Sequence, residues 1–410
     1  MNIKITPSPL VGTVSAVTSK SHAHRLLIAM ALSSNPGEVI MDTTSVDIQA
    51  TKECLLHLSD AIPNLQCQES GSTLRFLLPI AMTQKNKVIF TGSGRLPTRP
   101  LSPLKEEMES HGCHFSKTTG NSQEIFTVEG RLTCGNFILP GNISSQYITG
   151  LLFALPLLCG DSQISITSPL ESSAYVDLTL EVIRSFGVKI CVTEKNSLLT
   201  FHIFGRQEYV SPGAVKAEGD WSNSAFWIIG GIIEKNSAIT LTQLDSNSSQ
   251  GDSKILSLAK AMGGVIKSSN HEICALPRKL RGIEIDGSGI PDLIPILAVA
   301  ASVSEGQTRI YNAARLRIKE SDRLASMTEC LKALGGKIEE LEDGLIIQGV
   351  PYLTGGIVDS HNDHRIVMAM AIAASCASEP ITIKGAEAVN KSYPDFFKDF
   401  SRLGGKINVI

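Results

Sequence analysis

A charged segment near position 320 is the part of this sequence with the clearest capacity for chemistry. It reads RIKESDR over residues 317–323, and apolar residues follow it with the spacing of one helix face. This spacing predicts that Lys319 and Arg323 lie on the inward face of a helix's first turn. Two cations there repel each other and oppose the helix dipole, so an anion bound between them explains the arrangement. A solvated helix start balanced by Glu320 and Asp322 is the alternative.

Polar residues also open six further helices that are predicted to be apolar on every side. Such helices must be buried, and their first N–H groups then need partners. If several helix N-termini point toward the same region, that region suits an anionic ligand. Plain capping by Ser, Asn or Asp is the alternative for each opening. The openings begin at Ser19, Glu69, Asn142, Asp220, Ser288 and His361.

A repeated glycine indicates how these helices are organised. A helical pattern, a glycine and a strand-like run recur five times, at intervals of 69 to 76 residues. Intervals this regular indicate an internal repeat. The glycine fits the position just after a helix, where one residue often adopts the left-handed conformation. A sixth, degenerate copy is expected at Ala50–Leu58, where the glycine is missing. The five glycines are Gly112, Gly187, Gly263, Gly335 and Gly404.

Composition limits the partners of this 410-residue chain. Its net charge of −3 provides no general field for nucleic acid, so an anion site must come from local clusters. Nine cysteines without a CxxC pair suit a reducing compartment. The N-terminus resembles no signal peptide, and no apolar run is long enough to span a membrane. We therefore expect a cytoplasmic protein and a monomer, and we interpret His111 and His114 as surface residues without a metal.

Nine short motifs resemble those of the EPSP synthase (3-phosphoshikimate 1-carboxyvinyltransferase) family, in order and from end to end. They are Ser19-Lys20-Ser21 with Arg25, Gly71-Ser72 with Arg75, Arg99-Pro100, Ser144-Ser145-Gln146, Tyr175-Val176-Asp177, Ile290-Pro291-Asp292, Arg317-Ile318-Lys319-Glu320-Ser321-Asp322-Arg323, Asn362-Asp363-His364-Arg365 and Lys391-Ser392-Tyr393-Pro394-Asp395. Each motif is weak alone, whereas nine in this order are specific.

The resemblance implies an α/β fold of two similar globular domains, each built from three βαβαββ repeat units as an inside-out α/β barrel. One domain is expected over residues 20–217, with the serines that bind shikimate 3-phosphate and with Lys20 and Arg99. The other is expected over residues 1–19 and 218–410. It carries Asp292, Lys319–Arg323, Arg365 and Lys391. The active site is expected in the cleft between the domains.

The resemblance also implies a reaction in the shikimate pathway, toward chorismate and aromatic amino acids. The enolpyruvyl group of phosphoenolpyruvate moves to the 5-hydroxyl of shikimate 3-phosphate, and phosphate is released (EC 2.5.1.19). No metal and no cofactor are expected. Asp292 is expected to act as the base, with Glu320 and Lys20 as proton-transfer partners. His364 is either a further proton carrier or a packing residue.

The motifs place the substrate-binding residues as well. For shikimate 3-phosphate these are Lys20, Ser21, Arg25, Ser144, Ser145, Gln146, Ser172, Tyr175, Asp292 and Lys319. For phosphoenolpyruvate they are Lys20, Gly71, Arg99, Gln146, Arg323, Arg365 and Lys391. Two of these residues have a structural alternative, because Asp292 could cap a helix and Tyr175 could be a core aromatic residue.

Counting charges gives a further expectation. Seven cations against Asp292 and Glu320 leave +5, and the two substrates together carry about −5 to −6. A site this basic would be strained when empty, which favours two lobes that separate without ligand and close on it.

Two positions depart from the best-known branch of the family: Glu69 and Arg315 each stand where that branch has Asn. Glu69 makes sensitivity to the phosphonate inhibitor glyphosate an open question. Two other functions are alternatives. The sister enzyme that acts on UDP-N-acetylglucosamine uses a cysteine, which the loop 92–99 lacks, and a non-catalytic relative would retain only anion binding.

Overall fold

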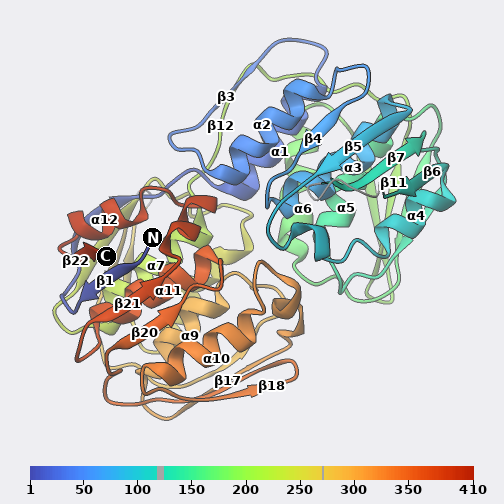
Figure 1. Cartoon of the computed structure of the whole chain (residues 1–410). Helices are drawn as coiled ribbons and strands as arrows, with labels where there is room; N and C mark the ends of the chain where they lie inside the picture. The colour runs from blue at the N-terminus through green and yellow to red at the C-terminus, as the bar shows by residue number, and fades with distance from the viewer. Residues whose placement is uncertain (118–123, 270–271) are drawn as a thin grey trace. The chain divides into compact units, whose positions relative to one another are not determined.

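The computed structural model describes residues 1–117, 124–269 and 272–410. The chain divides into two compact units, which Figure 1 shows along the colour gradient. Unit 1 comprises Met1–Ser19, Asp42–Ser45 and Glu218–Ile410, and unit 2 comprises Lys20–Met41 and Val46–Ala217. Residues 42–45, expected in the domain of residues 20–217, belong to unit 1 instead. Thr18 and Thr43 explain this, because the backbone N–H of each donates to the hydroxyl of the other, at 2.8 and 3.0 Å.

Unit 1 contains three four-stranded sheets, with the strand orders β20-β21-β1-β22, β14-β15-β13-β2 and β16-β17-β19-β18. Its strands are β1 (Ile3–Thr6), β2 (Val11–Ser15), β13 (Ala238–Thr242), β14 (Val265–Ser268), β15 (Glu272–Leu276), β16 (Glu284–Asp286), β17 (Gln307–Tyr311), β18 (Lys337–Leu341), β19 (Gly344–Gln348), β20 (Gly356–Asp359), β21 (Ile381–Lys384) and β22 (Lys406–Val409). Its helices are α7 (Trp221–Ile233), α8 (Ile255–Ala261), α9 (Ile294–Ser302), α10 (Arg323–Ala333), α11 (His364–Ser375) and α12 (Phe396–Arg402), with short 3-10 helices η3 (Gly251–Lys254), η4 (Ala314–Ile318) and η5 (Ala386–Lys391).

Unit 2 contains two four-stranded sheets, β4-β5-β7-β6 and β10-β11-β9-β8, and a two-stranded sheet, β12-β3. Its strands are β3 (Glu38–Ile40), β4 (Asn64–Gln66), β5 (Lys87–Thr91), β6 (Cys113–Ser116), β7 (Glu124–Gly130), β8 (Asn136–Leu139), β9 (Ser162–Ile166), β10 (Ile190–Lys195), β11 (Leu198–Ile203) and β12 (Ala214–Lys216). Its helices are α1 (Lys20–Leu32), α2 (Val46–His57), α3 (Gly71–Gln84), α4 (Leu104–Ser110), α5 (Ser145–Ala154) and α6 (Ser173–Ser185), with η1 (Leu96–Thr98) and η2 (Leu155–Leu157).

All five four-stranded sheets repeat one pairing pattern. In β16-β17-β19-β18, for example, β17 lies parallel to β16 and antiparallel to β19, with Ile310 opposite both Ile285 and Leu345. In this sheet the parallel pair is joined through α9, and β18 and β19 form a hairpin, which is the predicted βαβαββ unit. In β20-β21-β1-β22 the N-terminal strand β1 pairs with the C-terminal strand β22 in place of the hairpin, and in β14-β15-β13-β2 the chain passes through unit 2 between β2 and β13. The sixth unit lacks this hairpin, because α2 leads directly into β4 and β12 pairs only with β3. The prediction of a degenerate copy near Ala50–Leu58 is therefore confirmed.

The five repeated glycines end their helices as predicted. Each lies two residues after the last residue of α4, α6, α8, α10 or α12. Each has a positive φ, between 77° and 102°. A residue with a Cβ is strained in this conformation, so glycine allows the chain to reverse from the helix into the next strand.

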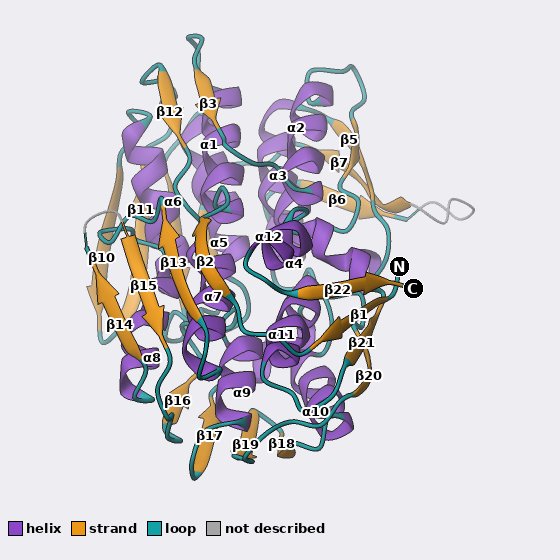
Figure 2. Cartoon of the chain, turned by 90° about the vertical axis from the view of Figure 1, so that its left-hand side faces the viewer, coloured by secondary structure: helices purple, strands orange, loops and turns teal. Residues whose placement is uncertain are grey.

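Buried helices form the centre of each unit. All residues of α9 and α11 are buried, as are the residues of α7 up to Ile232. These three helices contact one another, and Figure 2 shows strands of the unit's sheets around them. In unit 2, α3 packs closely on α5. Helices buried on all sides must be apolar all round, which explains the absence of an amphipathic pattern in their sequences.

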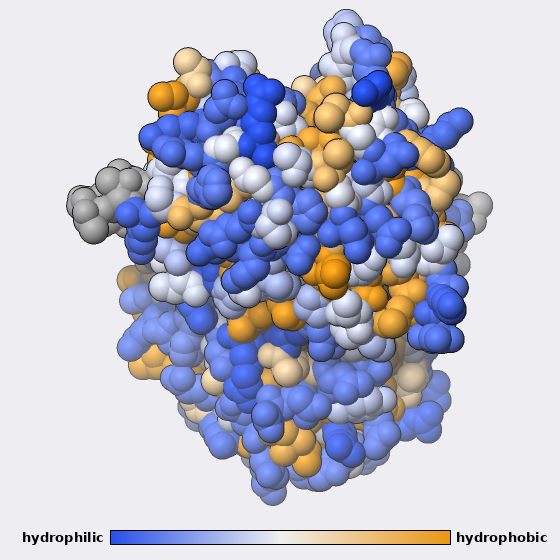
Figure 3. Space-filling view, turned by 90° about the vertical axis from the view of Figure 1, so that its right-hand side faces the viewer, coloured by the Kyte–Doolittle hydropathy of each residue, from blue (hydrophilic) through white to orange (hydrophobic). Residues whose placement is uncertain are grey.

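The face of the protein in Figure 3 is mostly hydrophilic. On the face in Figure 3, hydrophobic residues occur in several separate patches among hydrophilic ones. Within the described ranges, no helix is both long and apolar enough to cross a membrane.

Candidate active site

The first turns of the three central helices of unit 1 carry polar groups into one region. Asp220 is the N-cap of α7 and accepts from Asn223 N at 2.7 Å, and Asp363 is the N-cap of α11 and accepts from Arg365 N at 2.9 Å. Helix α9 differs, because its N-cap is Leu293 and no side chain caps it. The capping alternative for Asp292 is therefore wrong, and its carboxylate is directed to arginines instead.

Arg323 is the most enclosed cation of this region, with only 1% of its side chain exposed. Its guanidinium donates to Asp292 at 2.7 Å, to Glu320 at 2.8 Å and to Asp363 at 2.8 Å. Burial alone lowers the pKa of Arg323, but the carboxylates of Asp363, Glu320 and Asp292 outweigh it and raise the pKa well above its ordinary value. Arg323 is thus a permanent cation that holds three acids together.

The predicted place of Lys319 in the first turn of a helix is wrong. Helix α10 begins only at Arg323, because Asp322 caps it by accepting from Ala325 N at 3.2 Å. Lys319 precedes this cap and follows η4. Burial lowers the pKa of Lys319 to about 8, with Asp292 opposing and Arg315 reinforcing the shift. Lys319 can therefore gain or lose a proton near neutral pH.

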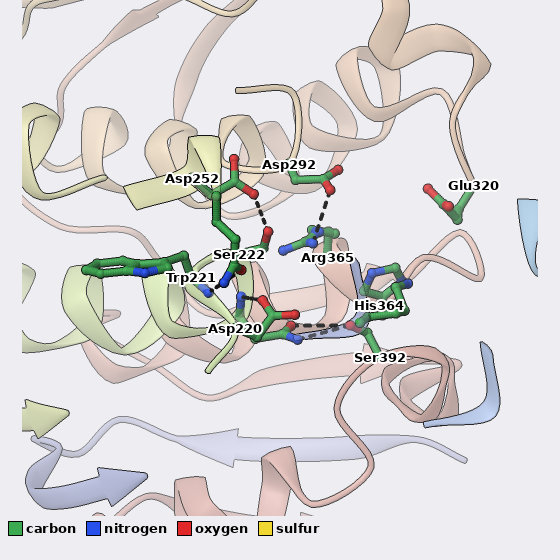
Figure 4. A network of polar contacts seen from close by, with 12 residues as sticks. Asp220, Trp221, Ser222, Asp252, Asp292, Glu320, His364, Arg365 and Ser392 are labelled. Carbon is green, nitrogen blue, oxygen red and sulfur yellow. Dashed lines mark hydrogen bonds and ion pairs between the residues drawn. The ribbon is translucent and has the colours of Figure 1, made fainter. Parts of the chain in front are cut away.

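Arg365 lies beside Asp292 at the start of α11, as Figure 4 shows. Its Nη2 donates to Asp292 Oδ2 at 3.3 Å, whereas its buried Nε and Nη1 have no hydrogen-bond partner among the described residues. Burial raises the pKa of Asp292, but Arg365, Lys319 and Arg323 together hold it well below its usual range. The region therefore pairs an ionised carboxylate with a cation that has donors available for an anion.

Two further predicted residues lie at the same end of α11. The Lys391 ammonium donates to the backbone carbonyl of Asn362 at 2.7 Å. His364 is 2% exposed, and its Nδ1 lies 3.8 Å from Asp363 Oδ1. This burial favours the packing role for His364.

In unit 2, the residues at the start of α1 bond to one another and to α5 and α6. Lys20 forms an ion pair with Asp47 at 2.8 Å. Arg25 donates to the carbonyls of Ser21 at 2.6 Å and Tyr175 at 2.8 Å. Burial lowers the pKa of Arg25 to about 9. Arg25 is 3% exposed, so in this structure it holds α1 against α6.

Two arginines converge on the start of α3. A Cβ at Gly71 would lie 2.5 Å from Nη1 of Arg75 and 2.8 Å from Nη1 of Arg99, so glycine leaves room for both guanidiniums. Arg75 donates to Gln146 Oε1 at 3.0 Å and to the carbonyl of Pro100 at 2.9 Å. Arg75 thus positions Gln146 on α5 and the loop that carries Arg99. Arg75 belongs to one of the nine motifs, but the resemblance implied no role for it.

The predicted serines lie at the starts of α5 and α6. Ser144 caps α5 by accepting from Gln146 N at 3.3 Å, and Ser145 is buried as the first residue of that helix. Ser172 is buried with a φ of 54° and precedes α6, whereas Tyr175 is half-buried. Ser144 therefore does cap its helix, and capping leaves its hydroxyl proton able to bond elsewhere.

Several of the predicted cations have further acids beside them. Asp47 pairs with Lys20, and Asp363 pairs with Arg323. Asp220 and Asp252 both raise the pKa of Arg365. A count of acids from the motifs alone therefore overstates the positive charge next to the cations of each unit. Asp363 stands in a quoted motif, whereas the other three lie outside every motif and become neighbours only through the fold.

Comparison with known proteins identifies the family. Residues 59–400 match the profile of EPSP synthase (3-phosphoshikimate 1-carboxyvinyltransferase). The chain belongs to the EPSP synthase family. It is 44% identical to the 3-phosphoshikimate 1-carboxyvinyltransferases of Clostridium novyi and Clostridium kluyveri, over 99% of this chain and 98% of each relative. Both the predicted family and the fold class are confirmed by these comparisons and by the structural ones below.

Solved structures extend the likeness of fold. The EPSP synthase of Acinetobacter baumannii superposes with a TM-score of 0.79 at 24% identity and covers 100% of both chains. The enolpyruvyl transferase NikO of Streptomyces tendae superposes with a TM-score of 0.77 at 17% identity, over 99% of this chain and 98% of that one. Across the described ranges, no group of three or more His, Cys, Asp or Glu side chains is arranged to hold a metal ion.

Proposed function

We propose that this chain transfers the enolpyruvyl group of phosphoenolpyruvate to the 5-hydroxyl of shikimate 3-phosphate and releases phosphate. The observation that carries the proposal is the contact of Asp292 with two buried arginines, Arg323 and Arg365. Two N–H groups of Arg365 have no hydrogen-bond partner in the part of the chain that the structure describes. An ionised acid beside cations that can bind an anion is what the addition of an alcohol to a phosphorylated enol requires. Family membership supports the choice of substrates.

Asp292 accepts the hydroxyl proton in this proposal. A carboxylate whose pKa lies below its usual range cannot hold an alcohol proton before bond formation, so the proton must leave as the oxygen attacks C2 of the enol. A proton is delivered to C3 in the same stage, and we assign this to Glu320 or Lys20. The resulting tetrahedral intermediate then loses phosphate from C2 and a proton from C3, which restores the double bond of the enol. Binding of the donor anion draws Arg365 and Arg323 toward it and makes Asp292 more basic.

The substrates are assigned to residues of both units. We assign phosphoenolpyruvate to Arg323, Arg365 and Lys391 of unit 1 and to Lys20, Gly71, Arg99 and Gln146 of unit 2. We assign shikimate 3-phosphate to Asp292 and Lys319 of unit 1 and to Lys20, Ser21, Arg25, Ser144, Ser145, Gln146, Ser172 and Tyr175 of unit 2. Donors at the start of α5 suit the phosphate of the acceptor, because a helix N-terminus and hydroxyl groups favour an anion.

A phosphate-release assay tests the function. Purified protein with phosphoenolpyruvate and shikimate 3-phosphate is expected to release one phosphate for each 5-O-(1-carboxyvinyl)-3-phosphoshikimate formed, with the product identified by its mass. Release that requires UDP-N-acetylglucosamine instead would point to the sister activity. Heat of binding for both substrates without any phosphate release would point to a non-catalytic relative.

We also propose that the protein acts as a monomer in the cytoplasm. The reducing compartment fits nine cysteines that are all free thiols. Size-exclusion chromatography with light scattering is expected to give the mass of one chain, 43.9 kDa. A mass of twice this value would contradict the proposal.

A further inference from the structure

Asp252 is a buried carboxylate for which the proposed reaction has no role. It lies in η3 and is 2% exposed. Its Oδ2 accepts a short hydrogen bond from the Ser222 hydroxyl in the first turn of α7. In Figure 4, Asp252 and Asp292 both lie above Arg365, and Ser222 lies beside it. An acid that is removed from water at this position needs a stabilising partner or a reason to be neutral.

Arg365 is held more by charge than by hydrogen bonds. Among the described residues, its guanidinium donates one side-chain hydrogen bond, at 3.3 Å to Asp292, and its carbon lies 6.0 Å from the centre of the Phe226 ring. Burial lowers its pKa, but the carboxylates of Asp292, Asp220 and Asp252 act together to raise it. The charge of these acids therefore sets how strongly Arg365 attracts another anion.

We infer that Asp252, fixed by Ser222, is a positioning residue that adjusts the charge around Arg365, so that protonation of Asp252 strengthens the binding of phosphoenolpyruvate. This rests on the proposed function only for the identity of the anion. Asp252 acts through Arg365 and does not touch the reacting atoms. When it is neutral, one acid fewer competes with the incoming anion for the guanidinium.

Asp252 is expected to change its protonation state within a pH range in which the enzyme can be assayed. Burial is the largest cause that raises the pKa of Asp252, to about 6. Three charged groups on different elements face it: Asp220 from α7 and Asp292 from the turn before α9 raise its pKa, and Arg365 from α11 lowers it. The Ser222 hydrogen bond also lowers the pKa. Phosphoenolpyruvate is therefore bound more tightly below pH 6 than above it, apart from the titration of its own phosphate.

The test compares wild type with Asp252→Asn, which resembles the protonated acid in shape and charge. The KM for phosphoenolpyruvate is measured for both proteins from pH 5.5 to 8. At each pH the KM of the variant is divided by the KM of the wild type. This ratio cancels the titration of the substrate phosphates, which also occurs near pH 6. At pH 8 the KM of Asp252→Asn is expected to be about tenfold lower than that of wild type, and at pH 5.5 the two should agree. A ratio that stays constant over this range would show a purely structural role and overturn the inference.

Two more variants sharpen the test. Ser222→Ala removes a hydrogen bond to the ionised form of Asp252, so it should raise the pKa of Asp252. The pH at which the KM for phosphoenolpyruvate changes should then be higher. Asp161→Asn changes an exposed carboxylate of unit 2 that accepts from Gly205 N at 3.0 Å, and its ratio should be flat. The assignment to Asp252 would be contradicted if Ser222→Ala did not shift the pH at which the KM changes. It would also be contradicted if Asp161→Asn gave the same pH-dependent ratio as Asp252→Asn.

Direct binding separates this inference from the proposed function. Calorimetry with phosphoenolpyruvate alone measures the same ratio of affinities without turnover. Normal phosphate release with a flat ratio would overturn the inference and leave the function intact. No phosphate release with a pH-dependent ratio would overturn the function and leave the inference intact. Absence of phosphoenolpyruvate binding at every pH would overturn both.

Discussion

The helix starts of the two units hold their cations in different ways. In unit 1, the three acids Asp292, Glu320 and Asp363 surround Arg323. In unit 2, Arg25 and Arg75 donate to carbonyl, hydroxyl and amide oxygens. Acids next to cations can exchange protons, whereas cations held by neutral oxygens keep their charge for a ligand. The same repeat has thus produced a helix start in unit 1 where three acids surround one arginine, and helix starts in unit 2 where two arginines are held by neutral oxygens.

The strongest way to break this comparison is to remove the base from unit 1. Asp292→Asn keeps an oxygen that can accept from Arg323, but it cannot take up a proton. Turnover is expected to fall by about 10²–10⁴-fold, the usual loss for a general base. Phosphate release measures it, and thermal unfolding checks that the variant folds. A variant that keeps more than about a tenth of wild-type turnover would move the role to Glu320 or Lys20.

A second test removes a structural acid. Asp363→Ala leaves Arg323 buried with one acid fewer, and it also removes the N-cap of α11. The free energy of unfolding is expected to fall by about 3–5 kcal/mol in chemical denaturation. The matched change in unit 2, Asp47→Ala, breaks the partly buried Lys20 pair without removing a helix cap, and should cost less, about 1.5–3 kcal/mol. Equal losses would mean that the two units hold their cations alike.

The stabilisation from Asp363 should also depend on pH. Burial raises the pKa of this carboxyl, but Arg323 and His364 outweigh burial and hold it below its ordinary value. Its contribution is therefore present above the unfolded pKa of about 3.9 and is lost as the pH falls through the lower folded value. The stability difference between wild type and Asp363→Ala should shrink accordingly in acid.

The third test concerns the anion-binding side. Replacing Ser144 and Ser145 together by Ala removes two hydroxyl donors at the start of α5. The affinity for shikimate 3-phosphate is expected to fall by a few kcal/mol at most, since a hydrogen bond to a charged group contributes about 1.5–3 kcal/mol. Calorimetry measures it directly. Unchanged affinity would mean that Ser144 only caps the helix.

The smallest expected effect is a pH dependence from Lys319. Its pKa is lowered to about 8, so above pH 8 the free enzyme loses a cation proposed to bind shikimate 3-phosphate. The value of kcat/KM for this substrate should then fall, by up to about tenfold for each pH unit. Lys319→Arg stays charged over this range and should remove the fall. The same fall in both proteins would exclude Lys319 as its source.

Local sequence patterns predicted the repeat because they depend on the backbone of a few neighbouring residues. Gly335 and its four counterparts adopt positive φ wherever a helix turns into a strand, so their spacing reveals the repeat directly. The missing hairpin of the sixth copy was visible as a missing glycine. Motif order, in turn, predicted the family.

Charge balance could not be predicted in the same way. Asp220 and Asp252 are brought beside Arg365 by the packing of α7, η3 and α11, and no local pattern links them to that residue. The error at Lys319 has another origin: helical spacing extended the helix one turn too far, whereas the Asp322 cap began it at Arg323. Periodicity therefore did not predict the charge balance, which depends on tertiary contacts, or the start of α10, which depends on its capping residue.

The most direct test of the division between the two units compares Asp292→Asn with the Ser144→Ala and Ser145→Ala double variant in one phosphate-release assay. The account predicts that Asp292→Asn lowers kcat by at least about 10²-fold while the KM for shikimate 3-phosphate stays within a few-fold of wild type. The double variant should instead raise that KM and keep kcat within a few-fold. If the serine variant loses kcat and Asp292→Asn loses only affinity, the roles proposed for Asp292 and for the two serines are wrong.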